Sequence, residues 1–545
     1  MVADAQLGFY TLLVLLAMAI CMAIIPLMIK IAPAIGMLDA PDDRKVHSSA
    51  VPRSGGIGIV VGLMLPLLIW IPLDKVVVSV LCGCAILLIF GAWDDARAIS
   101  PKLKFIGQFL ATAVVVFYGD LYVSQLPFAS LDGMPEWIAK PFTVFAIVGM
   151  INALNLSDGL DGLAGGEALI SLIAIAYLSY QFDGITAMAV CAATIGGIFG
   201  FLRFNSHPAK IFMGDAGSQT LGFLLGVTVI MLTQRVNPVM SPVAALLLLG
   251  LPVLDCLVVF YMRWRRGDSL VVAAKDHLHH RLLAIGFHHY ESVTVIYTVQ
   301  AVLVSLAVFI PYESDALLLS LYALLGVVLY TSVLIAERTG WRVHAKSDQR
   351  EEFLSTLLTR YPLVNSIPEK ILMTGLTVVL LASVLTAETI PSDIGISSLL
   401  LIVLLIIWYI DSRSLTLLRL IVFISLGTSS YLISTHPPEW LLEDINLVYL
   451  FYGLMMLAAF VRVRLSSNDQ FAITPLDYLV IIIAVVVALM PETDVGSQSL
   501  TFVAIQMIIL FYSAEMIIQK MRSSRNALAG TLLVTLILLS ARALL

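Results

Sequence analysis

The sequence predicts an all-α fold, a polytopic bundle of transmembrane helices, on two observations. Of its 545 residues, 60% are hydrophobic and only 12% are charged, whereas about a quarter of the residues in an ordinary soluble domain are charged. Many segments also reach the roughly 20 apolar residues that a helix needs to cross a bilayer, where every backbone amide must be paired inside the helix. Together these observations exclude a water-soluble fold.

About eleven spans are predicted in the first 336 residues, and about seven with weaker signatures follow residue 370. The first eleven cover 9–29, 57–72, 75–92, 103–118, 138–156, 167–180, 185–202, 217–233, 242–262, 291–310 and 315–336. The other seven cover 371–389, 396–410, 415–433, 445–461, 476–490, 499–518 and 526–541. The first segment has neither the basic start nor the small-residue cleavage site of a secretory signal, so we expect it to be retained as a span.

Basic residues favour the loops on one side of the predicted membrane. Among the first eleven spans, the loops after odd-numbered spans carry nearly all Lys and Arg, and the opposite loops carry only Lys75, Lys140 and Arg235. Because basic loops are retained in the cytoplasm, we expect the amino terminus outside and the odd-numbered loops inside.

A polar and charged stretch separates two groups of spans. We therefore expect a membrane domain at 1–336, a cytoplasmic linker at 337–370 and a multi-span extension at 371–545. The spans of the extension contain few charges, so no second active site is expected there. Packing, oligomerisation or recruitment of partners is its simplest role.

Five loops on the predicted cytoplasmic side are dense in polar groups of one chemical kind. They read Asp42-Asp43-Arg44-Lys45-Val46-His47 followed by Pro52-Arg53-Ser54-Gly55-Gly56, then Asp94-Asp95, then Asn152-Ala153-Leu154-Asn155-Leu156-Ser157-Asp158-Gly159-Leu160-Asp161-Gly162, then Phe212-Met213-Gly214-Asp215-Ala216-Gly217-Ser218, and last Asp276-His277-Leu278-His279-His280-Arg281. The glycines of the first and fourth loops are expected to let the backbone approach a ligand closely.

Each loop by itself has an ordinary explanation. Asp94-Asp95 can mark where a helix meets water, Asp158 and Asp161 can cap a helix, and the histidines before Arg281 suit an interfacial helix. Together they place several acidic groups, with basic and imidazole groups, on one membrane face, although acidic residues are disfavoured near hydrocarbon. A Mg²⁺ ion and a diphosphate would compensate such a set, as phosphoryl transfer requires. Zinc fits less well because these loops lack cysteine.

Four of the motifs, in this order, resemble those of the polyprenyl-phosphate N-acetylhexosamine-1-phosphate transferases, the superfamily that also contains the phospho-MurNAc-pentapeptide translocase of peptidoglycan synthesis. They are the Asp-Asp pair, the Asn-x-x-Asp-Gly-x-Asp-Gly run, the Phe-Met-Gly-Asp-x-Gly-Ser run and the His-x-His-His-Arg run, and the similarity covers roughly residues 9–336. The resemblance implies transfer of an N-acetylhexosamine 1-phosphate, GlcNAc 1-phosphate first, from a UDP-sugar to undecaprenyl phosphate, with release of UMP. It also implies Mg²⁺ as cofactor, with Mn²⁺ as a substitute.

The resemblance assigns roles to single residues. Asp215 looks like the main Mg²⁺ ligand, with Asp94, Asp95 and Asp161 around the metal and the phosphates. The expected substrate contacts are Asn155 and Asp158 with uracil, Phe212 stacked against uracil, His279, His280 and Arg281 with the donor diphosphate or sugar, and Lys45 with a phosphate. The expected catalytic set is Asp94, Asp95, Asp161, Asp215, His279 and His280.

Two departures from the peptidoglycan branch narrow this expectation. That branch has three consecutive histidines in the last loop and a Thr-Pro-Thr-Met-Gly-Gly run in the first, whereas this chain has Leu278 between two histidines and Pro52-Arg53-Ser54-Gly55-Gly56. The departures favour the branch that initiates O-antigen, enterobacterial common antigen, teichoic acid or exopolysaccharide chains. We expect a location in the bacterial inner membrane with the active site on the cytoplasmic face. Nucleic acid is not an expected partner, and the extension is expected to form a homodimer or to bind glycan-assembly proteins.

Two mechanisms and two rival functions remain open from the sequence. The lipid phosphate can attack the sugar-bearing phosphorus directly, or Asp94 or Asp95 can first form an aspartyl phosphoenzyme. A transporter or lipid flippase would also have many spans, but transporters usually carry polar groups near the bilayer midplane on broken helices, whereas these aspartates lie at the inner ends of spans. A membrane scaffold predicts wild-type behaviour for Asp215→Asn.

Overall fold

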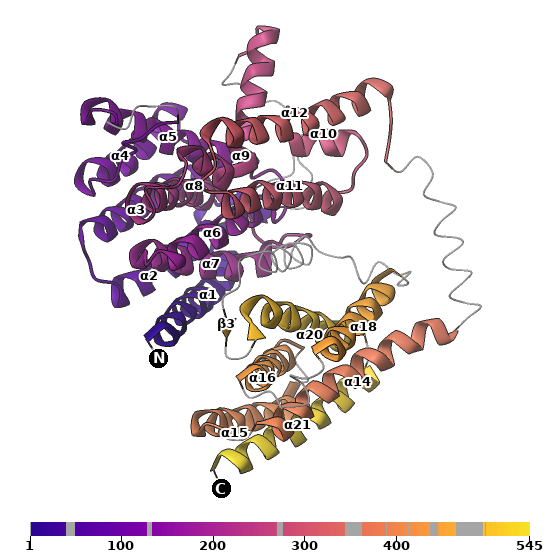
Figure 1. The fold of residues 1–545 in the computed structure, drawn as a ribbon. Coiled ribbons are helices and arrows are strands. Elements are labelled where there is room, and N and C mark those ends of the chain that lie inside the picture. The colour runs from indigo at the N-terminus through magenta and orange to yellow at the C-terminus, as the bar shows by residue number, and fades with distance from the viewer. Residues whose placement is uncertain are drawn as a thin grey trace. The chain divides into compact units, whose positions relative to one another are not determined.

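The chain is almost entirely helical in a computed structural model (Figure 1). The structure describes residues 2–39, 50–127, 133–269, 276–343, 362–387, 390–412, 415–435, 445–464, 494–495, 498–520 and 522–544. Strands within these ranges are limited to two antiparallel pairs of two-residue strands, β1 (Leu38–Asp39) with β2 (Val51–Pro52) and β3 (Asp494–Val495) with β4 (Gln498–Ser499). Eleven of the described helices are long and apolar enough to cross a membrane. The predicted all-α, multi-span fold is therefore confirmed.

The described helices divide into two compact units, one up to Val343 and one from Pro362 onward. The last helix of the first unit ends at Thr339, and the first helix of the second unit begins at Pro362. Both ends fall within the stretch 337–370 where the sequence suggests a linker.

The first unit contains all of the motif residues that the structure describes. Its helices in the described residues are α1 (Val2–Ile35), α2 (Gly55–Trp70), α3 (Lys75–Ala96), α4 (Pro101–Ala113) with the π-helical turn η1 (Val114–Tyr118), α5 (Glu136–Ser157), α6 (Leu163–Gln181), α7 (Ile185–Asn205), α8 (Gly214–Met231) with η2 (Leu232–Val236), α9 (Pro242–Arg266), α10 (Leu278–Ala284), α11 (His289–Phe309) and α12 (Asp315–Thr339). Each of the first eleven predicted spans lies on one of these helices, and α10 is an additional short helix of seven residues.

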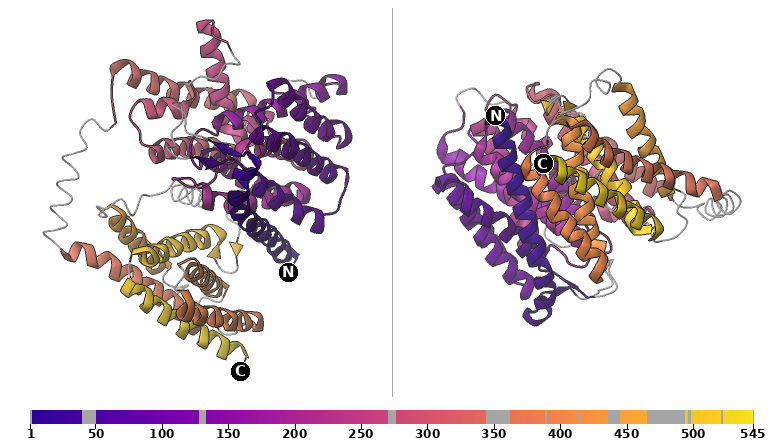
Figure 2. Two further views of the ribbon diagram at one scale, coloured as in Figure 1. Left: turned by 180° about the vertical axis from the view of Figure 1, so that it is seen from behind. Right: turned by 90° about the horizontal axis from the view of Figure 1, so that it is seen from below.

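The second unit is a smaller bundle, in which α14 and α21 lie alongside each other (Figure 2). Its described helices are α14 (Pro362–Thr386), α15 (Ser392–Ile407) with η3 (Trp408–Ser412), α16 (Leu415–Thr435), α18 (Ile445–Arg464), α20 (Leu500–Lys520) and α21 (Arg522–Leu544). Six of the seven spans predicted after residue 370 lie on these helices, and the span at 476–490 lies outside the described residues. An ion pair between Arg419 and Glu515 joins α16 to α20, with Nη2 and Oε1 2.6 Å apart.

Helix α8 forms the centre of the first unit. All of its residues are buried, and it packs against α2, α3, α5 and α6. Glycines allow this close packing: a Cβ at Gly56 would overlap the backbone of Gly217, and a Cβ at Gly91 would overlap that of Ala216. The expectation that Gly56 and Gly217 make room for a ligand is therefore wrong, because protein backbone occupies that space. The close packing at these glycines holds the amino-terminal end of α8, which carries Asp215, in a fixed position.

Helix α9 is broken in its middle. Gly250 has φ 63° and ψ −134°, a backbone conformation that favours glycine. The interrupted backbone is paired by side chains: Leu251 N donates to Gln300 Oε1 at 2.7 Å, and the Tyr322 hydroxyl donates to Gly250 O at 2.9 Å. Gln300 Nε2 donates in turn to Ser171 Oγ at 2.7 Å. These contacts satisfy the irregular backbone that hydrocarbon would not tolerate.

Candidate active site

The motif loops meet at one end of the first unit. The segment before α2 lies directly beside the segment before α8, because Phe212 N donates to Pro52 O at 2.7 Å and Gly55 N donates to Phe212 O at 2.9 Å. Gly56 N donates to Met213 O at 2.8 Å. The first and fourth motifs therefore form one connected backbone structure, with the half-buried Phe212 in it.

Asp95, at the end of α3, holds the start of α8. Its two carboxylate oxygens accept hydrogen bonds from Asp215 N at 2.9 Å and Ala216 N at 3.1 Å, and its side chain is only 1% exposed. A carboxylate in this place pairs two otherwise unsatisfied N–H groups and interacts favourably with the positive end of the helix dipole. Arg53 Nε lies 3.9 Å from Asp95 Oδ1. Asp95 therefore positions Asp215 through the backbone.

Asp94 and Asp215 converge on one ammonium group, that of Lys104 on α4. The Lys104 Nζ lies 3.0 Å from Asp94 Oδ2 and also contacts Asp215 Oδ2. Two amides complete the surroundings of Asp215: Asn155 Nδ2 donates to Oδ1 at 3.2 Å, and Gln219 Nε2 donates to Oδ2 at 2.9 Å. The structure thus brings together three predicted site residues from α3, α5 and α8.

Lys104 is not among the site residues expected from the sequence, where it stands out only as one of the basic loop residues. A signal was available, since Ser100 caps α4 and Pro101 starts it within about two helical turns of the Asp-Asp motif. The first turn of α4 is therefore held near the end of α3. Its lysine is within reach of both carboxylates.

Asp94 and Asp215 are also the groups best suited to hold Mg²⁺. Their side chains are 12% and 9% exposed and present carboxylate oxygens to a single cation, the Lys104 ammonium. Hard cations such as Mg²⁺ prefer oxygen ligands and one or two carboxylates. Besides their contact with each other, these carboxylates accept from nitrogen donors of lysine, amides and backbone, so no thiol or imidazole competes among those contacts.

The third of the five polar loops, which ends at Gly162, forms a tight turn between α5 and α6. Gly162 N donates to Asn205 Oδ1 at 2.8 Å, and the Tyr297 hydroxyl donates to Gly162 O at 2.7 Å. Desolvation raises the pKa of Asp158 in this turn to about 7; the Arg53 guanidinium opposes the rise, and the carboxylates of Asp215 and Asp161 add to it. Asp158 is therefore close enough to Asp215 and Arg53 for their charges to shift its pKa.

The imidazoles of the fifth polar loop, Asp276 to Arg281, pack against this turn. A buried carboxylate on α9, Asp255, accepts from His277 Nδ1 at 2.6 Å and from Leu278 N at 3.0 Å, and so fixes the start of α10. His279 is 3% exposed, and its ring lies directly against Gly159. Burial lowers the pKa of His279 to about 3, so this imidazole is neutral at physiological pH. The His280 ring centroid lies 4.2 Å from that of His279.

Arg281 is already paired within the protein. Its Nε donates to Glu337 Oε1 at 2.9 Å and its Nη2 to Glu337 Oε2 at 2.6 Å, a two-point pair that ties α10 to α12. Glu337 and Asp255 are both residues that the sequence analysis missed. Neither stands in a motif, so only contact in three dimensions identifies them.

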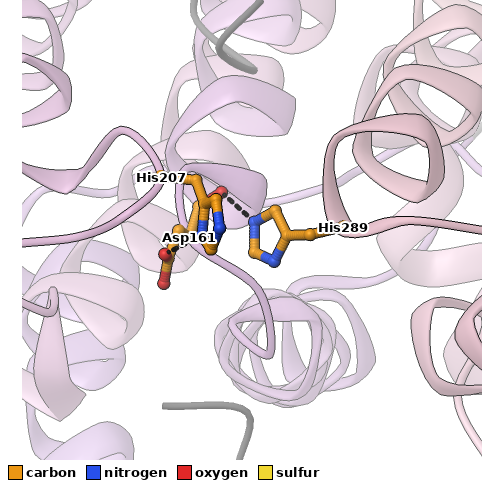
Figure 3. A group of neighbouring side chains, drawn as sticks. All are labelled: Asp161, His207 and His289. Atoms are coloured by element: carbon orange, nitrogen blue, oxygen red, sulfur yellow. Dashed lines mark hydrogen bonds and ion pairs between the residues drawn. The ribbon is translucent and has the colours of Figure 1, made fainter. Parts of the chain in front are cut away.

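Asp161 lies in a different group from Asp215. Its Oδ2 accepts from His207 Nδ1 at 2.7 Å and from Ala209 N at 3.0 Å, and its carbonyl oxygen lies 3.3 Å from His289 Nε2 (Figure 3). The remaining predicted site residue, Lys45, lies outside the described residues, as do the other members of the run Asp42 to His47.

Comparison with known proteins agrees with the motifs. Residues 77–233 match glycosyl transferase family 4. The probable undecaprenyl-phosphate N-acetylglucosaminyl 1-phosphate transferase of Bacillus subtilis (strain 168) is 32% identical over 340 residues, which cover 62% of this chain and 94% of that protein. This chain belongs to the polyprenyl-phosphate N-acetylhexosamine-1-phosphate transferase family.

Other relatives agree with this placement. The undecaprenyl-phosphate alpha-N-acetylglucosaminyl 1-phosphate transferase of Escherichia coli (strain K12) is 33% identical over 297 residues, covering 52% of this chain and 79% of that protein. The protein of the same name from Yersinia pestis is 32% identical over 329 residues, covering 58% and 87%. The family predicted from the motifs is confirmed, and the chain is a multi-pass membrane transferase of that family.

Proposed function

We propose that this transferase moves an N-acetylhexosamine 1-phosphate, GlcNAc 1-phosphate first, from a UDP-sugar to undecaprenyl phosphate and releases UMP. The observation that carries the proposal is the convergence of Asp94 and Asp215, from two helices, on the Lys104 ammonium at the end of the bundle. The names of its relatives in Bacillus subtilis and Escherichia coli support both the sugar and the lipid acceptor.

An apolar groove that includes α4, the helix that carries Lys104, supports a polyprenyl acceptor. The groove has a volume of about 460 Å³ and lies between α4 with η1 and α5. Its lining is aliphatic and aromatic, consisting of Ile106, Phe109, Leu110, Ala113, Phe117, Pro141, Val144 and Phe145. Ile106 lies on the same helix as Lys104 but on a different side of it, because residues two apart do not share a helix face, so the groove supports binding of the lipid chain and not a particular position of its phosphate.

The proposed chemistry is direct displacement at the sugar-bearing phosphorus. An oxygen of the lipid phosphate forms the new P–O bond while the bond to the UMP oxygen breaks. The second pKa of a phosphate monoester is near 6, so much of the acceptor is dianionic at neutral pH and needs no strong base. Mg²⁺ held by Asp94 and Asp215 would supply charge neutralisation at the phosphates. Lys104 would bind a phosphate oxygen through its three N–H donors.

The other motif residues would orient the donor. Asp95 holds the backbone that carries Asp215, and Asn155 holds the Asp215 side chain. Asp158 and Phe212 would contact uracil. The neutral His279 would offer hydrogen bonds, and not positive charge, to the sugar or diphosphate, and His280 lies beside it.

The phosphoenzyme alternative now has one candidate nucleophile. Both oxygens of Asp95 accept backbone hydrogen bonds, and its side chain is 1% exposed, so it is poorly placed to attack phosphorus. Asp94 is the more accessible carboxylate. Recovery of a radiolabelled phosphoprotein from wild type, absent in Asp94→Asn, would support double displacement and reject direct attack.

The pathway and the location extend the proposal. We place the protein in the bacterial inner membrane with Asp215 on the cytoplasmic face, where it would initiate a lipid-linked O-antigen, common-antigen, teichoic acid or exopolysaccharide chain. The second unit would serve a homodimer or glycan-assembly partners. A transporter is less well supported, because the polar groups at the break in α9 are used in pairing the backbone.

The test is UMP release by purified full-length protein with undecaprenyl phosphate, Mg²⁺ and a panel of UDP-sugars. Asp215→Asn should lose most turnover and keep its melting temperature. Asp183→Asn is the matched control, because Asp183 is exposed beyond the far end of α6. Near wild-type turnover in Asp215→Asn would reject the proposed site and favour a scaffold.

A further inference from the structure

Two imidazoles and a carboxylate from three separate segments meet beside the third motif (Figure 3). Asp161 lies in the turn before α6, His207 follows α7, and His289 is the first residue of α11. One nitrogen of each imidazole and one carboxylate oxygen lie within 4.8 Å of one another. The two imidazole rings are stacked, with centroids 4.2 Å apart.

Hydrogen bonding leaves a nitrogen of this group without a partner. The carbonyl of Asp161 can only accept, so the His289 Nε2 that faces it at 3.3 Å carries the hydrogen. His289 Nδ1 then holds a lone pair, and among the described residues this buried atom has no hydrogen-bond partner. A buried acceptor without a donor is costly. In Figure 3 this nitrogen lies on the side of the ring away from the Asp161 carbonyl, so a cation shared with Asp161 and His207 satisfies it after the His289 ring turns.

The three segments are held in place independently of any ligand. Gly162, next to Asp161, donates to Asn205 at the end of α7, and Tyr297 on α11 donates to the Gly162 carbonyl. Ala209 N donates to Asp161 Oδ2 at 3.0 Å. Such outer contacts are typical of residues that orient metal ligands.

We propose that Asp161, His207 and His289 form a binding site for a divalent transition-metal ion of the Zn²⁺ type, separate from the Asp94 and Asp215 carboxylates. Two nitrogen ligands and one carboxylate favour borderline ions over Mg²⁺, which prefers oxygen, and three protein ligands leave coordination positions open to water. The ion replaces the proton between His207 Nδ1 and Asp161 Oδ2. Metal bonds of about 2.1 Å at a tetrahedral angle separate ligand atoms by roughly 3.4 Å, so the 2.7 Å contact must lengthen.

The test is Zn²⁺ binding by the purified full-length chain, carrying an affinity tag without histidine and kept in excess Mg²⁺. Competition with a zinc-chelating dye should show one tightly bound Zn²⁺ per chain in wild type. His207→Gln and His289→Gln should each weaken Zn²⁺ binding by at least about 10- to 100-fold. Loss of an outer-shell partner typically costs that much, and these residues are the proposed ligands themselves. Because the His207 side chain is 43% exposed, its replacement is expected to leave folding intact.

Two controls separate this site from its neighbours. Asp94→Asn tests the Mg²⁺ carboxylates, and His280→Gln tests the histidines of the fifth motif; both should bind Zn²⁺ like wild type. Zn²⁺ should also raise the melting temperature of wild type, by mass action on the folded state, and not that of His207→Gln. Absence of a tight site in wild type, binding that survives both His207→Gln and His289→Gln, or loss of binding in either control would overturn the proposal.

Discussion

Replacing Lys104 by methionine should tighten Mg²⁺ binding and lower turnover. In the structure the Lys104 ammonium occupies the oxygens of Asp94 and Asp215 that the proposed metal needs, at 3.0 Å from Asp94 Oδ2. Mg²⁺ must therefore bind against a resident positive charge. Methionine keeps the length of the side chain and removes that charge, so the carboxylates become more attractive to a cation while the proposed phosphate contact is lost.

The size of the effect follows from Coulomb's law. Unit charges 4 Å apart interact by about 4 kcal/mol at an effective dielectric constant of 20, so an ammonium and a divalent ion repel by about 8 kcal/mol at that distance. The Lys104 side chain is 27% exposed and can move away, so we expect about an eighth to a quarter of that value. This corresponds to roughly 1–2 kcal/mol, or a 5- to 30-fold lower Kd for Mg²⁺.

Metal affinity can be measured without turnover. Calorimetry with Mg²⁺, or the resonance signal of free Mn²⁺, gives the Kd for wild type, Lys104→Met and the control Lys102→Met, whose side chain is exposed. An unchanged or higher Kd in Lys104→Met, with binding still dependent on Asp215, would refute the idea that ammonium and metal compete for one place.

Three further substitutions test the surroundings of the site. Asp95→Ala removes the acceptor of two backbone N–H groups at the start of α8, and should lower unfolding free energy by roughly 2–4 kcal/mol in thermal or denaturant melts; an unchanged melt would exclude this role. Glu337→Gln should lower the free energy of unfolding by about 1–2 kcal/mol, because Glu337 is 34% exposed. A raised KM for the donor without destabilisation would instead make Arg281 a substrate contact. The pKa of Asp158 is about 7 in the folded state against 3.8 unfolded, so the folded state binds the proton more tightly and stability should fall as pH rises from about 4 to 7. Melts between pH 5 and 8 should lose this slope in Asp158→Asn, and equal slopes would contradict the assignment.

Much of the fold was accessible from the sequence because membrane spans are a local property. A span needs only enough consecutive apolar residues, so the first eleven predicted spans fall on helices even where their ends differ, as for 57–72 against Gly55–Trp70. Short motifs with fixed spacing then identified the family. The alternation of spans implied that Asp94, Asp95 and Asp215 lie at one end of the bundle, and the structure joins them there.

The sequence could not assign partners to these groups. It treated Lys104 as one of many basic loop residues, and it grouped Asp161 with the carboxylates around Asp215. In the structure Lys104 bridges Asp94 and Asp215, whereas Asp161 pairs with His207. Except for Lys104 with Asp94, such contacts join residues 46 to more than 100 positions apart, over distances of a few ångströms that depend on how helices pack.

By itself, then, the sequence determined which segments are apolar enough to form membrane helices, which loops are expected on one face and which family's motifs they carry, because hydropathy, charge bias and spacing act along the chain. Only the tertiary structure decided which side chain faces which. Asp95 is a support for α8, Arg281 is paired with Glu337, and His279 is a neutral imidazole. The physical reason is that hydrogen bonding, ion pairing and burial fall off within a few ångströms, so they are set by the packing of helices such as α3 against α8.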